Sequence, residues 1–258
     1  MTYLSLLAVF VGIPILVLAR CPAGTAAAAV SGRLQAGALA VLLGLALAAT
    51  IPWDAALLAR GTWTYPHGLQ LGRIAGVPVE ECLFMLLQPV LVALWLRRLP
   101  AVPPGRRPRL GARIAGPVAL LVLAAAGVAL ATRPATSYLG LVLAWAAPPL
   151  ALQWALGGDV LARRWRLLLR AALPPALYLC AVDRLALRLD LWQLSGTRTT
   201  GAAVLGLPVE EAVFFALTTA LLAGGLILGT DRRVLRRCVP RAAIVPVGEA
   251  GRPSGGVR

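Results

Sequence analysis

The chain has 258 residues, of which 59% are hydrophobic and 14% are charged, and its formal net charge is +15. Soluble globular domains average close to half apolar and a quarter charged residues, so this composition excludes an ordinary soluble domain and indicates an integral membrane protein. A basic chain can also indicate nucleic-acid binding. Here membrane topology accounts for the charge, and we expect no nucleic-acid partner.

Seven apolar stretches are long enough to cross a bilayer, because about 20 helical residues span its hydrocarbon layer. In chain order they are residues 3–19, 34–52, 77–96, 114–132, 138–156, 167–187 and 204–229. The sixth contains Arg170, Asp183 and two adjacent prolines, a combination that allows a broken or a tilted helix. The sequence therefore predicts an all-α integral membrane protein with about seven transmembrane helices.

Arginine provides all 25 basic residues. With the N-terminus outside, 19 arginines fall on the inner side of the membrane and six on the outer side. The positive-inside rule then places the C-terminus in the cytoplasm. We therefore expect a multi-pass protein of the cell membrane. Asp159 and Asp231 are single acids beside arginines, and we expect both at the surface.

Two segments repeat one pattern of acidic and aromatic residues, D-x8-W-x14/15-P-V-E-E-x-x-F. The first copy runs from Asp54 to Phe84 and the second from Asp183 to Phe214. The copies lie four spans apart, so both point the same way through the membrane, unlike the inverted repeats of many transporters. The predicted divisions are a first three-helix repeat (1–100), a linker helix (101–135), a second repeat (136–230) and a basic, disordered cytoplasmic tail (231–258).

A single Pro-Val-Glu-Glu segment has a simple structural interpretation. Proline suits the first turn of a helix, and acids there interact favourably with the helix dipole. Doubled acids, the matching upstream Asp and Trp, and the use of six of the ten acidic residues in the two motifs favour a function instead. Ionisable residues at membrane depth usually face the bundle interior. The candidate acid/base residues are Asp54, Glu80, Glu81, Asp183, Glu210 and Glu211.

These acids are suited to proton transfer. Apolar surroundings and a neighbouring carboxylate favour the neutral form of a carboxyl group, whereas the helix dipole favours the ionised form. Such a set can hold a proton donor beside an acceptor, and it titrates as a unit. Aromatic faces stabilise cations by about 0.5–2 kcal/mol each, although each ring could instead be an interface residue. The candidate substrate-binding residues are Trp63, Phe84, Trp192, Phe214 and Phe215.

Other chemistry has little support in the sequence. There is no dinucleotide fingerprint, no P-loop and no cysteine or histidine spacing typical of a metal site. The single histidine, His67, is an expected loop residue. We predict no cofactor and no metal, with a metal held by adjacent glutamates as a minor alternative.

The repeated P-x-E-E-x-x-F motif, preceded each time by Asp and Trp, resembles the membrane-bound lycopene cyclase domain family in its fused form. The resemblance covers residues 1–230. It implies acid-catalysed, redox-neutral cyclisation: protonation of a linear carotene end group, ring closure of the carbocation, and loss of a proton. Lycopene would give β-carotene via γ-carotene with no cofactor. The implied partners are lycopene and membrane lipid, and other carotenoid-pathway enzymes are candidate partners.

Several alternatives stay open from the sequence. The segments "TWTYPHG" and "LWQLSGTRTTG" that follow Asp54 and Asp183 differ, so one glutamate pair alone could transfer the proton. The substrate could be a C50 carotenoid, and the ring could be of the ε or γ type. A different class is a proton-coupled or lipid-substrate transporter, which the parallel repeat disfavours. A third interpretation is a structural subunit of a carotenoid-modifying complex.

Overall fold

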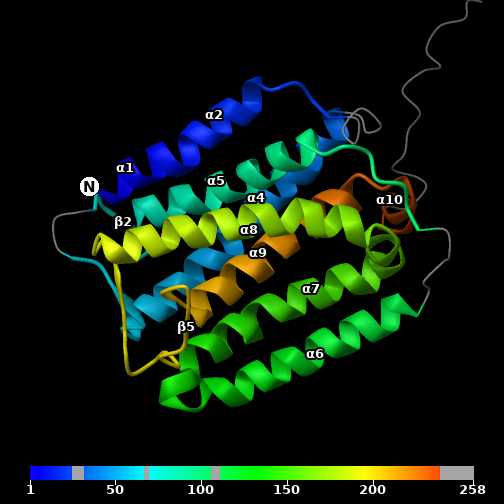
Figure 1. Ribbon diagram of the computed structural model, residues 1–258. Coiled ribbons are helices and arrows are strands. Elements are labelled where there is room, and N and C mark those ends of the chain that lie inside the picture. Colours follow the sequence, from blue (N-terminus) through cyan, green and yellow to red (C-terminus); the bar gives the residue numbers. More distant parts are fainter. Residues whose placement is uncertain (25–31, 67–69, 106–110, 239–258) are drawn as a thin grey trace, which may run out of the picture.

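The computed structural model describes residues 1–24, 32–66, 70–105 and 111–238, apart from the side chains of residues 32, 33 and 238. Within these residues, seven helices are long and apolar enough to cross a membrane, which confirms the predicted all-α membrane fold. They lie side by side as one bundle (Figure 1). The predicted site residues all fall inside the described part of the chain, whereas His67 and the end of the expected tail, residues 239–258, fall outside it.

The first span consists of α1 (Tyr3–Leu7), the π-helical η1 (Ala8–Gly12) and α2 (Ile13–Arg20). The remaining six spans are α4 (Gly32–Ala59), α5 (Val79–Arg98), α6 (Ala112–Ala131), α7 (Ser137–Arg163, entered through the 3-10 turn η2, Pro134–Thr136), α8 (Trp165–Arg188) and α9 (Val209–Gly229).

Of the two expectations for the sixth span, a break or a tilt, the break is absent: α8 continues through its two adjacent prolines. A proline inside a helix leaves the carbonyl group four residues earlier without its usual partner. For Pro174 that group belongs to Arg170, and it accepts a hydrogen bond from the Trp95 indole nitrogen of α5 at 2.8 Å. A neighbouring helix thus satisfies the freed backbone group, as membrane bundles allow.

Two helix ends also differ from the predicted ones. Helix α4 continues to Ala59, past the predicted end at residue 52, so that Asp54 lies inside the helix and is buried. Helix α9 begins only at Val209, because the residues before it form a strand that ends at Pro208. Asp54 therefore lies near the end of a transmembrane helix, as Asp183 does in α8.

Six short strands form three antiparallel pairs at the end of the bundle where the N-terminus lies (Figure 1). Two of the pairs are local hairpins, β2 (Arg73–Ile74) with β3 (Val77–Pro78) and β5 (Ala203–Val204) with β6 (Leu207–Pro208). The third joins the two motif connections, because β1 (Trp63–Thr64) pairs with β4 (Gln193–Leu194). The two copies of the repeated motif are thereby held together.

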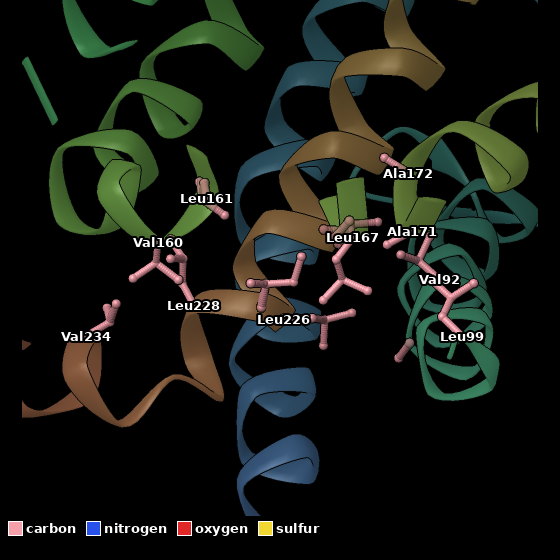
Figure 2. Close-up of a cluster of buried hydrophobic side chains, with 14 residues drawn as sticks. Val92, Leu99, Val160, Leu161, Leu167, Ala171, Ala172, Leu226, Leu228 and Val234 are labelled. Atoms are coloured by element: carbon pink, nitrogen blue, oxygen red, sulfur yellow. The ribbon is translucent and has the colours of Figure 1, made fainter. Parts of the chain in front are cut away.

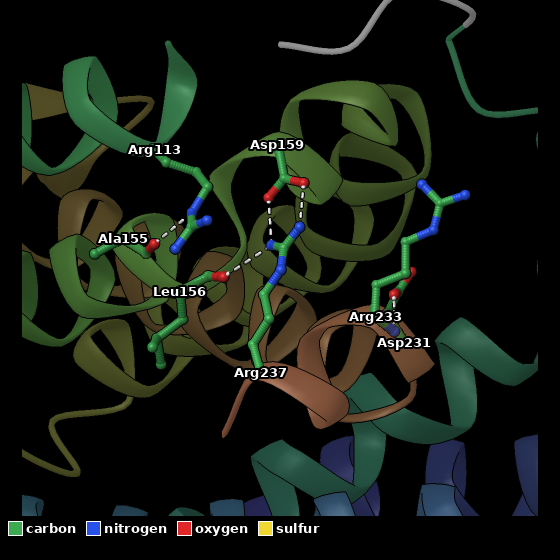
Figure 3. A network of polar contacts seen from close by, with 7 residues as sticks. All are labelled: Arg113, Ala155, Leu156, Asp159, Asp231, Arg233 and Arg237. Atoms are coloured by element: carbon green, nitrogen blue, oxygen red, sulfur yellow. Dashed lines mark hydrogen bonds and ion pairs between the residues drawn. The ribbon is translucent and has the colours of Figure 1, made fainter. Parts of the chain in front are cut away.

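The opposite end of the bundle carries α10 (Arg232–Cys238) and a large apolar cluster (Figures 1 and 2). Asp231 accepts a hydrogen bond from the Arg233 backbone and lies 3.1 Å from Arg164. Asp159 receives two hydrogen bonds from Arg237, at 2.9 and 3.0 Å (Figure 3). Asp231 is only 6% exposed, so it is not the surface residue expected from the sequence: its ion pair offsets burial. The expected tail thus begins with a docked helix.

Helix α6 packs along α7 at one edge of the bundle (Figure 1). A Cβ atom at Gly140 would lie 2.3 Å from the Ala131 nitrogen, and one at Gly127 would lie 2.7 Å from the Ala144 nitrogen. Glycines here let the two backbones approach closely, as is common between membrane helices. Helix α6 contributes nothing to the candidate site, because none of its described residues lines the cavity there.

Candidate active site

Each Pro-Val-Glu-Glu segment follows a tight hairpin turn. The two central turn residues have positive φ in both copies, 51° and 86° at Ala75 and Gly76, and 53° and 79° at Leu205 and Gly206. Positive φ at both positions is the signature of a type I′ turn. The proline that ends each hairpin also caps the following helix, so both glutamates fall in its first turn. The helix start expected from proline is present in both copies.

The first glutamate of each motif holds the connection that precedes it. The Leu71 backbone N–H donates to Glu80 at 2.8 Å. In the second copy, the backbone N–H and hydroxyl group of Thr200 donate to Glu210 at 2.7 and 2.8 Å. Both glutamates are fully buried, and neither lines the cavity described below.

The second glutamates line a cavity of about 530 Å³ that both repeats enclose. Glu81 and Glu211 enter it from α5 and α9, and Asp54 and Asp183 enter it from α4 and α8. Each aspartate interacts electrostatically with both glutamates, including the one from the other repeat. The structure thus brings four of the six predicted acids into one site.

Tyrosine hydroxyl groups hold the two cavity glutamates. Tyr138 donates to Glu211 at 2.8 Å, and Tyr65 donates to Glu81. Tyr3 also approaches the Glu81 carboxyl group. Burial and the neighbouring Glu81 carboxyl group raise the pKa of Tyr65 well above its usual value, so its hydroxyl group stays protonated and remains a donor.

Aromatic side chains form much of the remaining wall. All five predicted substrate-binding residues line the cavity, and so do Trp53 and Trp145, which the motif did not include. The Trp53 ring stacks on Trp145 and Phe214, with centroids 4.7 and 6.0 Å apart. The predicted residues that line the wall are Trp63, Phe84, Trp192, Phe214 and Phe215.

The aromatic contacts cross between the repeats. Tyr3 of the first repeat packs against Trp192 of the second, with ring centroids 4.9 Å apart. Tyr138 of the second repeat packs edge-on against Trp63 of the first, at 5.4 Å. Each tyrosine therefore touches the glutamate of its own repeat and the tryptophan of the other, so the site depends on both halves.

The repeated motif does not include Tyr3 and Tyr138, yet the sequence contains a signal for them. The first span begins "YLSL" at Tyr3 and the fifth begins "YLGL" at Tyr138. The spacing from each tyrosine to a later proline, Pro14 and Pro149, is also the same. Extending the repeat upstream of the aspartates would have identified both tyrosines. Tyr65 has no such counterpart, because Leu194 occupies its place in the second copy.

Deeper in the cavity, two buried polar residues at matching positions of the repeats meet. The Gln88 amide group donates to the Thr218 hydroxyl group at 3.0 Å. Thr218 in turn donates to the Phe214 carbonyl group at 2.8 Å, one turn earlier in α9. These contacts satisfy the polar atoms locally and leave the rest of the inner wall largely apolar.

The site therefore combines several carboxyl groups with an apolar, aromatic wall. No arginine is among the described residues that line it, so no cation there compensates four negative charges. Ionising all four groups together in apolar surroundings is strongly unfavourable, which leaves protons within the set. In the described part of the chain, the buried Oδ2 atom of Asp183 has no hydrogen-bond partner. The arrangement can donate a proton to an apolar molecule and take one back.

Comparison with known proteins identifies relatives over most of the chain. The sequence model of one family, described as lycopene cyclase, matches residues 1–99 and 135–241. A "Lycopene beta-cyclase" of Halobacterium salinarum is 43% identical over 230 residues, which are 88% of this chain and 95% of that protein.

Fungal proteins match as well. A "Bifunctional lycopene cyclase/phytoene synthase" of Neurospora crassa is 35% identical over 210 residues, 75% of this chain and 34% of that protein. One of the same name from Gibberella fujikuroi is 35% identical over 207 residues, 76% of this chain and 35% of that protein. No solved structure matches.

Proposed function

The chain belongs to the lycopene cyclase family, and we propose that it cyclises the linear end groups of lycopene, a step of carotenoid biosynthesis. The observation that carries this proposal is the set of four carboxyl groups in one apolar, aromatic cavity. A hydrocarbon has no group for a polar site to bind, and an apolar wall suits it. We expect a product with β rings, because the relative from Halobacterium salinarum is named a lycopene beta-cyclase.

The reaction begins when one carboxyl group of the set transfers a proton to the terminal double bond of the end group. The electron pair of a second double bond closes the six-membered ring and moves the positive charge onto the ring. A carboxylate of the set then removes a ring proton, and the electrons of that C–H bond form the ring double bond. One proton enters and one leaves, so the product is an isomer of the substrate and the acids are restored.

Other residues of the cavity wall are suited to these reaction steps. The ring faces of Trp53, Trp145 and Phe214 lie along the cavity, where aromatic faces stabilise a cation by about 0.5–2 kcal/mol each. The Tyr65 hydroxyl group holds the Glu81 carboxyl group and the Tyr138 hydroxyl group holds that of Glu211, so both proton-exchanging groups are fixed in the cavity. The four acids act as one coupled set rather than as separate groups.

We further propose that the protein lies in the cell membrane with its N-terminus outside and that membrane lipid surrounds the bundle. The arginine distribution supports this orientation. It places the four acids near the outer face, because they lie at the end of the bundle that carries the N-terminus and the hairpins. The two repeats, 1–100 and 136–230, then act as one unit around a shared cavity.

Adjacent glutamates provide the test, with a matched control in each motif. Glu81→Gln and Glu211→Gln remove a proton-exchanging group from the cavity, and we expect each to lower turnover about 10²-fold or more. Glu80→Gln and Glu210→Gln keep an acceptor oxygen for the connection, and we expect turnover within about tenfold of wild type. Purified protein is given lycopene in detergent, without a gradient, and chromatography of the carotenoids measures the products.

The results of this experiment distinguish a wrong function from a wrong assignment of the glutamates. If wild-type protein makes no cyclic product, the proposed function is wrong. If the Glu80 and Glu210 variants lose activity while the Glu81 and Glu211 variants retain it, the assignment of the glutamates is reversed. Turnover in detergent also excludes transport as the primary activity, because no membrane then separates two compartments.

A further inference from the structure

The residues that line the cavity are buried on one side of the bundle and exposed on the other. Toward the first span and α8 it is lined by Leu6, Val11 and Leu179, each at most 1% exposed. Toward α4 and α7 it is lined by Leu45 and Leu152, each 60% exposed. A side chain that both lines a cavity and lies on the outer surface marks the rim of an opening.

The exposed lining residues all belong to this one side. Among the described residues that line the cavity, Leu45, Ala49 and Leu152 are exposed, and all three lie on α4 or α7. The outer end is covered instead by the β1–β4 pair, where Trp63 and Tyr65 are both 8% exposed. The cavity therefore opens sideways, between two transmembrane helices.

The internal repeat allows the open and the closed side of the cavity to be compared position by position. On the open side, the Trp145 indole nitrogen of α7 donates to the Ala49 carbonyl group of α4 at 3.4 Å. At the matching position of the closed side, the Tyr178 hydroxyl group of α8 donates to the Phe10 carbonyl group at 2.7 Å. Both helix pairs are thus linked at corresponding positions.

The wall around these two links then differs. On the closed side, a cluster that includes Leu91, Leu179 and Phe215, with Ile15 and Leu18 against it, fills the space between the helices. On the open side, the matching helices leave Leu45 and Leu152 at the surface. The two sides are therefore formed by matching helix pairs, but this apolar cluster lies on the closed side.

We infer that the gap between α4 and α7 is a lateral portal through which one end of the linear carotenoid passes from the bilayer into the cavity. The inference rests on the proposed function, because it takes the carotenoid as the occupant. A hydrocarbon without polar groups resides among lipid tails, and an opening at the helix surface connects that layer with the acids. Leu45, Ala49 and Leu152 are the rim residues of this portal.

One portal leading to one set of acids has a consequence for the order of events. The two ends of the carotenoid enter one at a time, and the first ring must leave before the second end can reach the same acids. The monocyclic carotene is therefore a released intermediate, not a species that stays bound through both cyclisations.

Bulky rim substitutions test the portal. We expect Leu45→Trp and Leu152→Trp to lower the initial rate of lycopene consumption in lipid vesicles about tenfold, equal to about 1.4 kcal/mol in activation free energy. Val17→Trp is the matched control, since Val17 is the repeat counterpart of Leu152, is 54% exposed and does not line the cavity. We expect it to react at the wild-type rate. Leu152→Ala, which widens the rim, should react at least as fast as wild type.

A time course with wild-type protein tests the same proposal without any variant. With lycopene in large excess over protein, free monocyclic carotene should exceed the protein concentration before bicyclic product accumulates. Bicyclic product that forms without a free monocyclic stage, rim variants at the wild-type rate, or an equal loss in Val17→Trp would each overturn the portal. Wild-type protein that forms no ring at all would instead contradict the proposed function.

Discussion

The two glutamates of each motif point in different directions because they are neighbours on one helix. Successive residues of an α-helix do not face each other, so a cavity that receives Glu81 cannot also receive Glu80 from the same turn. Glu80 instead accepts from the Leu71 backbone, and Glu210 accepts from Thr200. We propose that the first acid anchors the connection and the second handles the proton. In this proposal the two adjacent acids have two different roles.

The tyrosine that holds Glu211 gives a prediction at the same scale. Tyr138→Phe removes the 2.8 Å hydrogen bond and leaves a buried carboxyl oxygen without its donor. A hydrogen bond to a charged group contributes about 1.5–3 kcal/mol. If that energy is lost in the transition state, turnover falls roughly tenfold to hundredfold. We expect kcat to fall while KM stays near wild type, since the cavity wall is kept.

Tyr178→Phe is the control for this variant. It also removes one hydroxyl hydrogen bond, to the Phe10 carbonyl group, but Tyr178 does not line the cavity. Its turnover should stay near wild type. Equal losses in both variants would mean that Tyr138 contributes only to the stability of the bundle.

At the scale of elements, the helices were predictable and the strands were not. Long apolar stretches specify the seven spans, and Pro78 and Pro208 mark the starts of α5 and α9. The hairpins before these prolines escaped prediction, because their central residues are Ala-Gly and Leu-Gly rather than the Asn-Gly or Asp-Gly typical of such turns. The β1–β4 pair joins segments far apart in the chain, and no local pattern specifies it.

Some residues of the candidate site were likewise predictable from the sequence, and others were not. The repeated motif supplied the acids and four of the aromatic residues, because they recur at fixed spacing in the sequence, and Phe215 directly follows the second copy. Trp53 and Trp145 lie outside the shared pattern, and only helix packing brings them to the cavity. Which glutamate of a pair faces the cavity depends on helix rotation, which the connection and its hydrogen bonds determine.

The β5–β6 turn provides a prediction about stability. Leu205 has a φ of 53° and is 84% exposed, so it adopts a left-handed conformation without any compensating burial. Such a conformation costs a residue with a branched side chain roughly 1–2 kcal/mol, and asparagine tolerates it better. Leu205→Asn should therefore raise the melting temperature in detergent by about 2–4 °C for each kcal/mol gained. Circular dichroism at 222 nm on heating would measure it.

A neighbouring strand residue controls for surface polarity. Val204 is also exposed, at 57%, but its φ is not positive. Val204→Asn should not raise the melting temperature, because asparagine is disfavoured in strands. An equal rise in both variants would show that the gain comes from removing an exposed apolar side chain and not from the turn.

For the whole molecule, the contacts between the repeats lead us to expect that activity needs both. The β1–β4 pair covers the cavity, Tyr3 and Tyr138 each pack on the tryptophan of the other half, and Gln88 meets Thr218 inside. Either repeat alone would expose its acids and lose one wall of the cavity. We therefore expect the differences that the sequence shows between the halves, such as Tyr65 against Leu194, to act within one shared site.

The orientation of the bundle gives the last prediction. Cys21 is exposed and follows α2 at the end where Gly24 bonds to the Arg97 carbonyl group, which the arginine distribution places inside. A membrane-impermeant maleimide applied to intact cells should therefore leave Cys21 unlabelled in a Cys238→Ser background. It should label Thr197→Cys, because Thr197 is exposed in the connection between α8 and α9, at the opposite end of the bundle.

Permeabilising the cells supplies the control, because Cys21 should then react as well. Cys82 is buried and Cys180 is half-buried within a span, so neither competes strongly for a polar reagent. The two reporters lie at opposite ends of one bundle, so they must respond in opposite ways for either orientation. Labelling of Cys21 in intact cells without labelling of Thr197→Cys would reverse the topology. The four acids would then face the cytoplasm, and the arginines would contradict the positive-inside rule.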